Sequence, residues 1–315
     1  MIIKILQGDC IESLNKLEDQ SINTCITSPP YWGLRDYNGE EKQLGLEDTP
    51  EEFVDNLVKV FREVKRVLRD DGTVWLNLGD SYAGNNSRAS NNGRAGYGTE
   101  REGVFRKTGK GLKTKDLVGI PWRVAFALQQ DGWYLRQDII WHKPNPMPES
   151  VKDRCTKAHE YIFLLSKSPK YYFDNEVIKE DSIYAPNKTH EKERAKGYYK
   201  GKWSNPEKGS RHDGSFKAIR DKKNKRSVWK VPTKGYKEAH FATYPTALIE
   251  PCVLAGCPKD GVVLDPFAGS GTTGIVAANH GRNSVLLELN KEYIEIAEKR
   301  INDAVGMFAS IKKGK

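Results

Sequence analysis

The feature that most constrains the fold is a glycine pattern near the carboxyl end of the chain. Gly269, Gly271 and Gly274 follow the apolar run 262–264 and precede a segment with helical periodicity. Glycines at such a turn let backbone N–H groups approach a ligand at the start of a helix. Glu288 closes the next apolar run, where its carboxylate is placed to accept hydrogen bonds from ribose hydroxyls. The pattern predicts a strand–loop–helix–strand unit that binds a nucleotide-like ligand.

Two other nucleotide sites compete with this interpretation. A Walker phosphate loop is excluded because no Gly-Lys-Ser/Thr follows the glycines. NAD is the obvious rival, but only 27 residues follow Glu288, so the second half of a dinucleotide fold would need strands from the amino terminus. Asp265 and Phe267 place a carboxylate and an aromatic ring where a cationic, adenine-bearing ligand would use them. A glycine-rich turn with a purely structural role is the remaining alternative.

Alternating strands and helices are expected along most of the chain. Thr49, Pro50 and Glu52 form a capping box with proline at the first helical position, which predicts a helix that stops at Asp71. The other expected strands and helices follow from apolar periodicity. The strands cover 2–7, 22–27, 73–78, 134–142, 160–166, 262–264 and 284–288, and the helices cover 11–17, 117–130, 248–255, the segment up to 278, and 291–302. This alternation indicates an α/β fold with a largely parallel sheet.

A second motif lies where the predicted strand 22–27 ends. It consists of Ser28, Pro29, Pro30 and Tyr31. Neither proline has an N–H, so the Ser28 hydroxyl and the Pro29 carbonyl present acceptors without competing donors. Two acceptors that hold the hydrogens of a conjugated amino group would direct its nitrogen lone pair toward an electrophilic methyl group. Tyr31 offers a stacking face to a base taken out of the duplex, although the motif alone is equally well a proline turn.

Positive charge is concentrated in two segments. The net charge of the chain is +9, yet residues 187–237 carry +12 and residues 84–115 carry +6, which leaves the remainder at −9. Basic segments on an otherwise acidic body are expected where a surface contacts phosphates. Arginines in these segments are candidates for reading guanine edges, and for each one the alternative is a solvated basic insert. The predicted DNA contacts are Arg88, Arg94, Arg211, Arg220 and Arg226.

Cysteine spacing and hydropathy exclude several classes. The five cysteines show no CxxC pair, which indicates a reducing compartment and argues against a disulfide framework and a zinc site. No apolar run approaches the ~20 residues of a membrane span, and the amino terminus lacks a signal-peptide pattern. We therefore expect a cytoplasmic protein with neither a metal nor a membrane partner.

Together, these motifs resemble those of the amino-methyltransferases that modify DNA in restriction–modification systems and phages. The order is similar to that of the permuted β group, with the Ser-Pro-Pro-Tyr motif first and the glycine loop last, and the resemblance covers about 1–83, 116–168 and 240–303. It implies a Rossmann-like, circularly permuted sheet that uses S-adenosylmethionine, with the tetrapeptide as the catalytic motif. The residues that it assigns to the cofactor are Asp9, His240, Tyr244, Thr246, Asp265, Phe267, Gly269, Gly271, Thr272 and Glu288.

The resemblance also implies partners and a division into regions. The expected regions are a catalytic domain at 1–169 and 240–305 with a mobile basic loop at 84–115, a target-recognition region at 170–239, and a basic tail at 306–315. Trp32 and Lys143 are added as DNA contacts, and Trp229 is one of the residues of the target-recognition region. The implied partners are double-stranded DNA and a possible cognate restriction endonuclease in a bacterial or phage-infected cell, with the protein a monomer or a homodimer.

The base that receives the methyl group is left open. Serine at position 28, in place of Asp or Asn, favours cytosine N4 by resemblance, while adenine N6 is the alternative. A 5-methylcytosine enzyme would need a nucleophilic cysteine after a proline, but the apolar segment around Cys252 predicts a packed core residue. A DNA-binding protein without activity, and an RNA or protein-glutamine methyltransferase, are the remaining alternatives.

Overall fold

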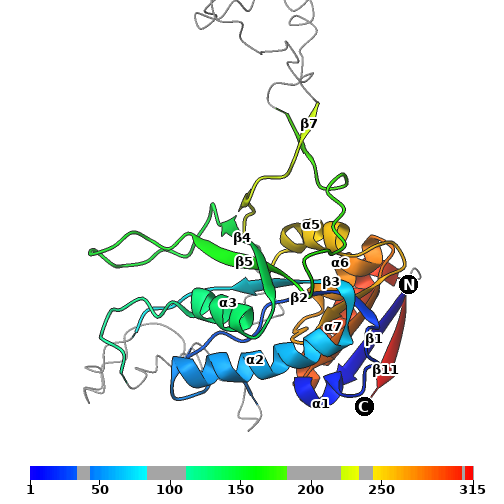
Figure 1. Ribbon diagram of the computed structural model, residues 1–315, viewed down its shortest axis with the longest axis horizontal. Helices are drawn as coiled ribbons and strands as arrows, with labels where there is room; N and C mark the ends of the chain where they lie inside the picture. Colours follow the sequence, from blue (N-terminus) through cyan, green and yellow to red (C-terminus); the bar gives the residue numbers. More distant parts are fainter. Residues whose placement is uncertain (34–42, 84–110, 183–220, 234–243, 307–308, 315) are drawn as a thin grey trace, which may run out of the picture. The chain divides into compact units, whose positions relative to one another are not determined.

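The computed structural model describes residues 1–33, 43–83, 111–182, 221–233, 244–306 and 309–314. Within these ranges, nine strands form one sheet in the order β11-β1-β10-β9-β2-β3-β5-β4-β8 (Figure 1). The strands of this sheet are β1 (Ile2–Gln7), β2 (Ile22–Thr27), β3 (Leu68–Leu78), β4 (Tyr134–His142), β5 (His159–Ser166), β8 (Val228–Lys230), β9 (Val262–Asp265), β10 (Asn283–Glu288) and β11 (Ser310–Gly314). The helices are α1 (Cys10–Leu14), α2 (Pro50–Val67), α3 (Ile120–Gln130), α5 (Thr246–Gly256), α6 (Thr272–Asn279) and α7 (Lys291–Val305).

The strand directions place most carboxyl ends at one edge of the sheet. The pairs from β11 through β3 are all parallel, and so is the pair of β4 with β8. Among the described strands of the sheet, only β5 runs against its neighbours, β3 and β4. The predicted α/β fold with a largely parallel sheet is confirmed. β9, which precedes the glycine loop, lies directly beside β2, which precedes the Ser-Pro-Pro-Tyr motif.

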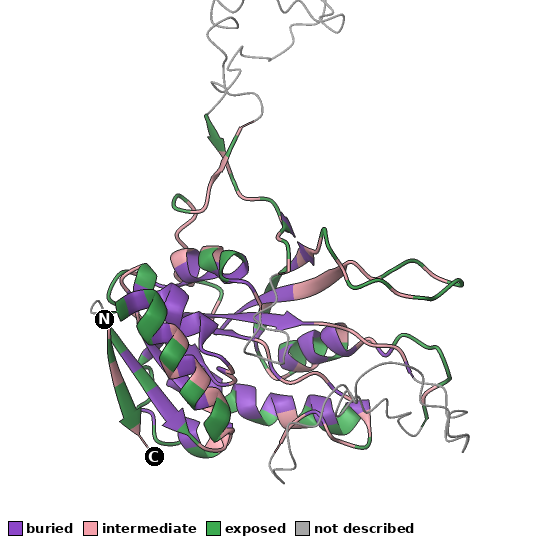
Figure 2. Ribbon diagram, turned by 180° about the vertical axis from the view of Figure 1, so that it is seen from behind, coloured by how far each residue is buried: buried purple, intermediate pink, exposed green. Residues whose placement is uncertain are grey.

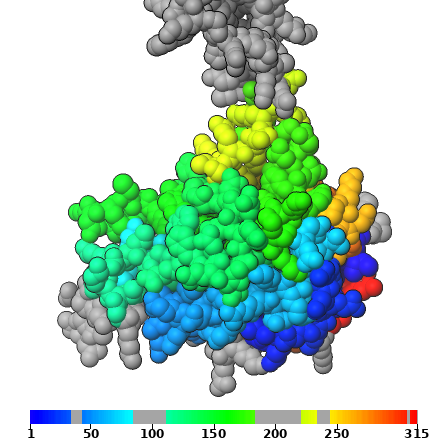
Figure 3. All heavy atoms as spheres, viewed as in Figure 1, coloured from blue at the N-terminus to red at the C-terminus, as the bar shows by residue number. Residues whose placement is uncertain are grey.

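Helices cover both faces of the sheet (Figures 1 and 2). α2 packs against α1 and α3, and their buried side chains share one core cluster with Cys25, Leu76 and Leu264 of the sheet. Figure 3 shows the side chains of α2 and of the residues around α3 on one continuous face. α6 packs against α5 and α7, and α6 and α7 share a second cluster with Ile3 and Ile5 of β1. The sheet is thus the middle layer of three.

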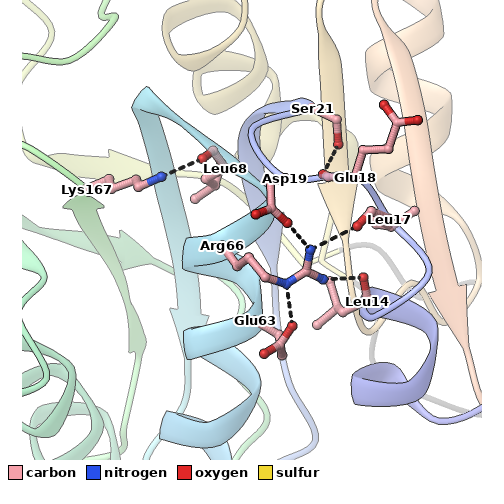
Figure 4. Close-up of polar contacts among 9 residues, drawn as sticks. All are labelled: Leu14, Leu17, Glu18, Asp19, Ser21, Glu63, Arg66, Leu68 and Lys167. Carbon is pink, nitrogen blue, oxygen red and sulfur yellow. Dashed lines mark hydrogen bonds and ion pairs between the residues drawn. The ribbon is translucent and has the colours of Figure 1, made fainter.

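α2 begins where its sequence predicts and is anchored at its other end. The Thr49 hydroxyl accepts from the Glu52 N–H, and the Glu52 side chain accepts from the Thr49 N–H, so the predicted capping box is confirmed. In the last turn, the Arg66 guanidinium donates to the carbonyls of Leu14 and Leu17 and to the carboxylates of Asp19 and Glu63 (Figure 4). These bonds tie the connection between α1 and β2 to α2, which positions the strand that leads to the tetrapeptide.

Two segments assigned to the protein surface belong to the sheet. Residues 310–314 were expected in a basic tail, but they form β11, which pairs with β1 because Ile311 packs against the second core cluster. Trp229 was assigned to the target-recognition region, but it is 6% exposed in β8 and its ring centre lies 6.5 Å from that of Trp75. Both expectations are wrong for the same reason: apolar side chains among lysines supply the buried face of an edge strand.

The chain divides into two compact units. One unit comprises Met1–Asp174 and Ser227–Lys315, and the other comprises Asn175–Arg226. In the second unit, the described residues include the short strands β6 (Glu180–Asp181) and β7 (Lys222–Lys223), which pair in antiparallel fashion. Most of the predicted target-recognition region and of the basic loop 84–115 lies outside the described residues.

The described residues also bear on membranes, metals and cysteines. None of their helices is long and apolar enough to cross a membrane. No group of His, Cys, Asp and Glu in these parts of the chain is arranged to hold a metal ion. None of the five cysteines, which all lie among the described residues, forms a disulfide bond, and Cys252 is 1% exposed inside α5, as its apolar surroundings predict.

Candidate active site

The two sequence motifs meet at the carboxyl edge of the sheet. β9 ends at Asp265, β10 ends at Glu288 and β2 ends at Thr27, so the glycine loop and the tetrapeptide leave neighbouring strands. β1, on the far side of β10, leads into Asp9 at the same edge, with Gln7 in register with Glu288. Parallel pairing therefore collects residues from both ends of the chain into one site.

Asp265 links the motifs through a buried hydrogen-bond network. Its side chain is 1% exposed, and Oδ1 accepts from the Thr27 hydroxyl at 2.6 Å and from the Phe267 N–H at 3.1 Å. Oδ2 accepts from the Tyr244 hydroxyl at 2.9 Å and from the Thr273 hydroxyl at 2.5 Å. Thr27 and Asp265 are 238 residues apart in the chain. Four donors from four segments thus hold one carboxylate between the glycine loop and the tetrapeptide.

Burial changes the acidity of this network. It raises the pKa of the Asp265 carboxyl, and the hydrogen bonds from Thr27, Thr273, Phe267 and Tyr244 oppose that rise. Burial also raises the pKa of the Tyr244 hydroxyl, and the charge of Asp265 raises it further. Tyr244 therefore remains protonated and donates to the carboxylate. In this arrangement, the predicted cofactor residues Asp265 and Tyr244 are buried and hold the glycine loop through hydrogen bonds.

The glycine loop is hydrogen-bonded to Glu288, and Gly269 in this loop borders open space. The Gly269 N–H donates to Oε2 of Glu288 at 2.7 Å, and the Asn290 N–H donates to Oε1 at 2.9 Å. Burial raises the pKa of Glu288, against the lowering effect of these two donors. Gly269 has φ +50°, and a Cβ there would meet nothing within 4 Å, whereas one on Gly271 would lie 2.9 Å from the Cβ of Ala297. Gly271 thus permits close packing with α7, while Gly269 borders open space.

The other predicted cofactor residues have distinct surroundings. Asp9 caps α1, with Oδ1 accepting from the N–H groups of Ile11 and Glu12. Thr272 is 3% exposed, and its hydroxyl accepts from Arg300 at 3.2 Å. Phe267 is partly buried against the first core cluster, and Thr246 is exposed at the start of α5. His240 lies outside the described residues.

The tetrapeptide is partly buried at the end of β2. Ser28, Pro30 and Tyr31 are half-buried, and Pro29 is buried. The Tyr31 hydroxyl donates to Oε2 of Glu160 at 2.7 Å. Its ring lies against the backbone that follows β3, because a Cβ on Gly79 would come within 2.6 Å of Cε2 of Tyr31.

The predicted DNA contacts fare differently. Trp32 is a correction: it is 3% exposed in the first core cluster, and its Nε1–H donates to the carbonyl of Glu47, so it offers no stacking face. Lys143 forms an ion pair with Glu160, and its Nζ lies 4.3 Å from the centre of the Trp141 ring. Arg226 is exposed in the second unit and pairs with Glu180 at 3.0 Å. Arg88, Arg94, Arg211 and Arg220 lie outside the described residues.

Sequence reasoning assigned no site role to three residues that organise the site. Thr27 and Thr273 are the hydroxyl donors to Asp265, and Glu160 is the acceptor for Tyr31. Each stands next to a recognised motif: Thr27 precedes the tetrapeptide, Thr273 lies inside the glycine pattern, and Glu160 lies in the predicted strand 160–166. Their positions hint at a role, but only the pairing of the strands shows their partners.

Comparisons with known proteins agree with this geometry. A DNA methylase family, named for N6 and N4 methyltransferases, matches residues 22–299. The Type II methyltransferase M.SmaI of Serratia marcescens is 47% identical over 301 residues, which cover 95% of this chain and 90% of that protein. The Type II methyltransferase M.Cfr9I of Citrobacter freundii is 46% identical over 304 residues, with 94% and 87% covered.

Two solved structures share the fold. The cytosine-N4-specific PvuII DNA methyltransferase matches with a TM-score of 0.62 at 19% identity, over 98% of this chain and 94% of that one. The protein TTHA0409 of Thermus thermophilus, solved with S-adenosyl-L-methionine, matches with a TM-score of 0.61 at 23% identity over the whole of both chains.

Proposed function

We propose that this chain, which belongs to the DNA methylase family of N6 and N4 methyltransferases, methylates the exocyclic N4 amino group of cytosine in double-stranded DNA. The methyl donor that the family uses is S-adenosylmethionine, and TTHA0409 was solved with it. The observation that carries the proposal is the hydrogen bond from Thr27 to Asp265, which joins the tetrapeptide strand to the glycine loop. An amino group and a methyl donor held at these two motifs would adjoin.

The residues at the edge of β1, β9 and β10 fit an adenine-bearing methyl donor. Gly269 borders open space, and the Glu288 carboxylate lies beside it with lone pairs left for ribose hydroxyls. Asp9 uses one oxygen, Oδ1, to cap α1 at the same edge, which leaves Oδ2 for a ligand donor. S-adenosylmethionine supplies an electrophilic methyl group on a positively charged sulfur. Asp265 keeps the loop in shape through its four internal donors rather than by touching this ligand.

The tetrapeptide holds the nitrogen that is methylated. The Ser28 hydroxyl and the Pro29 carbonyl accept the two amino hydrogens, which turns the nitrogen lone pair toward the methyl carbon. The Tyr31 ring stacks on the flipped base, an interaction of about 1–3 kcal/mol that offsets the cost of unstacking. The nitrogen releases its extra proton to water after the transfer, so no general base is required.

Cytosine is favoured over adenine by the first residue of the motif. The Ser28 hydroxyl is a neutral acceptor, which suffices for the cytosine amine, whereas a carboxylate would polarise the amino group more strongly. The PvuII enzyme, which shares the fold, is cytosine-N4-specific. Adenine N6 is the alternative, with the same two acceptors and the same stacking face. The Type II names of the relatives support a cognate restriction endonuclease as a partner.

The experiment is expression in a bacterium without DNA methylation, followed by mass spectrometry of nucleosides from its DNA. We expect N4-methylcytosine with the wild-type chain and none with Ser28→Ala. If N6-methyladenine is the only methylated nucleoside found, the target base is adenine and not cytosine. DNA without either nucleoside, from cells that contain the folded protein, would overturn the proposed enzyme and favour a DNA-binding protein without activity.

A further inference from the structure

Glu160 is the centre of a polar cluster beside the tetrapeptide. Its Oε2 accepts from the Tyr31 hydroxyl at 2.7 Å and from Nδ2 of Asn77 at 3.2 Å. Its Oε1 accepts from Nζ of Lys143, and this ion pair is largely enclosed, with side-chain exposures of 13% for Glu160 and 18% for Lys143. A carboxylate that receives three donors, one of them charged, has a defined orientation.

The sheet explains how Glu160 reaches this place. β5 is antiparallel to β3 and β4, so its amino-terminal residues lie at the edge where the neighbouring strands end. Glu160 is in register with Trp141 of β4, two residues before Lys143, and Tyr161 is in register with Leu78 of β3. The antiparallel strand β5 thus places Glu160, near its amino-terminal end, at the edge where the parallel strands have their carboxyl ends.

The Tyr31 ring is held on two sides. One contact is the Gly79 backbone, where a Cβ would lie 2.6 Å from Cε2 of Tyr31 and 3.3 Å from Cδ of Glu160. The other contact is the hydrogen bond from its hydroxyl to Glu160. The phenol oxygen lies on the axis of the Cβ–Cγ bond, so its hydrogen bond to Glu160 fixes the direction in which the side chain points and keeps the ring from swinging away. Rotation of the ring about the Cβ–Cγ bond is limited instead by its contact with the Gly79 backbone.

We propose that Glu160 is a positioning residue that sets the orientation of the Tyr31 ring for the target base, and that Lys143 holds Glu160 for this purpose. The inference rests on the proposed function, since it gives Tyr31 the role of stacking on the base. Lys143, which was predicted to contact DNA, thereby has a role through its ion pair with the Glu160 carboxylate. Glu160 touches neither the base nor the methyl donor in this scheme, so its effect passes through Tyr31.

The test compares purified full-length variants on unmethylated plasmid DNA. Glu160→Gln keeps the size of the side chain but turns one acceptor oxygen into an NH2 group, which then faces a donor. Tyr31→Phe removes the hydroxyl and keeps the ring. The matched control is Glu149→Gln, since Glu149 forms a similar ion pair with Arg154 in the connection between β4 and β5. Transfer of tritiated methyl groups gives kcat, and calorimetry with S-adenosylmethionine gives its Kd.

The expected result is a loss of about tenfold or more in kcat for Glu160→Gln and for Tyr31→Phe, with the Kd for S-adenosylmethionine unchanged within about twofold. The double variant should be hardly worse than either single one, because both substitutions act through the position of the Tyr31 ring. Glu149→Gln should retain kcat. An unchanged kcat in Glu160→Gln, or losses that multiply in the double variant, would overturn the inference. An inactive wild-type chain would instead count against the proposed function.

Discussion

The hydroxyl group of Thr27, which donates a hydrogen bond to Asp265, is expected to affect both the stability and the activity of the protein. Thr27 is 1% exposed at the last position of β2, and its hydroxyl donates to Asp265 at 2.6 Å, one residue before Ser28. The substitution Thr27→Val keeps the shape of the side chain and removes this donor. Asp265 retains its other three donors, so the carboxylate stays held but loses its link to β2.

The magnitude follows from the charge of the acceptor. A hydrogen bond to a charged group contributes ~1.5–3 kcal/mol, so the free energy of unfolding should fall by about 2 kcal/mol. A chain of 315 residues unfolds with an entropy of about 0.7 kcal/mol/K, which converts this loss into a melting temperature about 3 °C lower. Activity should suffer more, because a displacement of about 1 Å between reacting groups costs about a hundredfold in rate.

Thr24→Val is the matched control on the same strand. Thr24 is fully buried, and its hydroxyl contacts the carbonyl and hydroxyl of Thr73 rather than Asp265. Scanning calorimetry measures stability, and methyl transfer to unmethylated plasmid DNA measures kcat. We expect kcat to fall about tenfold or more in Thr27→Val and to stay within about twofold in Thr24→Val. Equal losses of kcat in the two variants, or a fully active Thr27→Val, would refute the reasoning.

The remaining predictions concern the glycine loop, a buried carboxyl and a reassigned tryptophan. Gly271→Ala should cost about 1–3 kcal/mol of stability in thermal melts, because its Cβ would lie 2.9 Å from that of Ala297. Gly269→Ala meets nothing within 4 Å, but its φ of +50° costs alanine about 1–2 kcal/mol, so this variant should lose some stability as well as weaken the binding of S-adenosylmethionine in calorimetric titration. Because burial raises the pKa of Asp265, the stability that its carboxyl contributes is present at low pH and is lost as the pH rises through the raised pKa. The advantage of the wild type over Asp265→Asn should therefore shrink in melts as the pH rises above the ordinary pKa of an aspartate. Trp229→Ala should lower the free energy of unfolding by about 3–5 kcal/mol, and an unchanged DNA affinity in filter binding checks its place in the core.

The regular elements are predictable where their signals are local. β1, β2 and β4 match the predicted strands residue for residue, and α2 starts at its capping box. β3 is longer than predicted because it begins at Leu68, which pairs with Ile22 of β2. The polar residues 69–72 interrupt the apolar run, so nothing local predicts this pairing. Strand ends therefore depend on a neighbour that the local pattern does not contain.

The candidate site is predictable in its motifs but not in its contacts. The type of a residue predicts that Asp265 and Glu288 carry chemistry, but not that protein donors already occupy Asp265. The presence of an aromatic residue also does not predict whether its side chain points into the core or toward solvent. Trp32 lies next to the tetrapeptide and Trp229 lies in a basic segment, yet both are buried. Burial of a large indole ring stabilises the fold, whereas an exposed ring stabilises nothing until a base binds.

The sheet explains why the order of the motifs along the chain does not disturb the site. What the chemistry requires is that the carboxyl ends of β9 and β2 adjoin, and they do so although their residues are 238 positions apart. The edge strand β11 pairs in parallel with β1, so the N–H of Ser310 at the start of β11 donates to the carbonyl of Met1 at 2.9 Å, while Gly314 at the end of β11 lies beside Leu6 (Figure 1). The site geometry therefore depends on which strands adjoin and not on the order of the motifs along the chain, and the bond from Thr27 to Asp265 is the contact that any order of the motifs must keep.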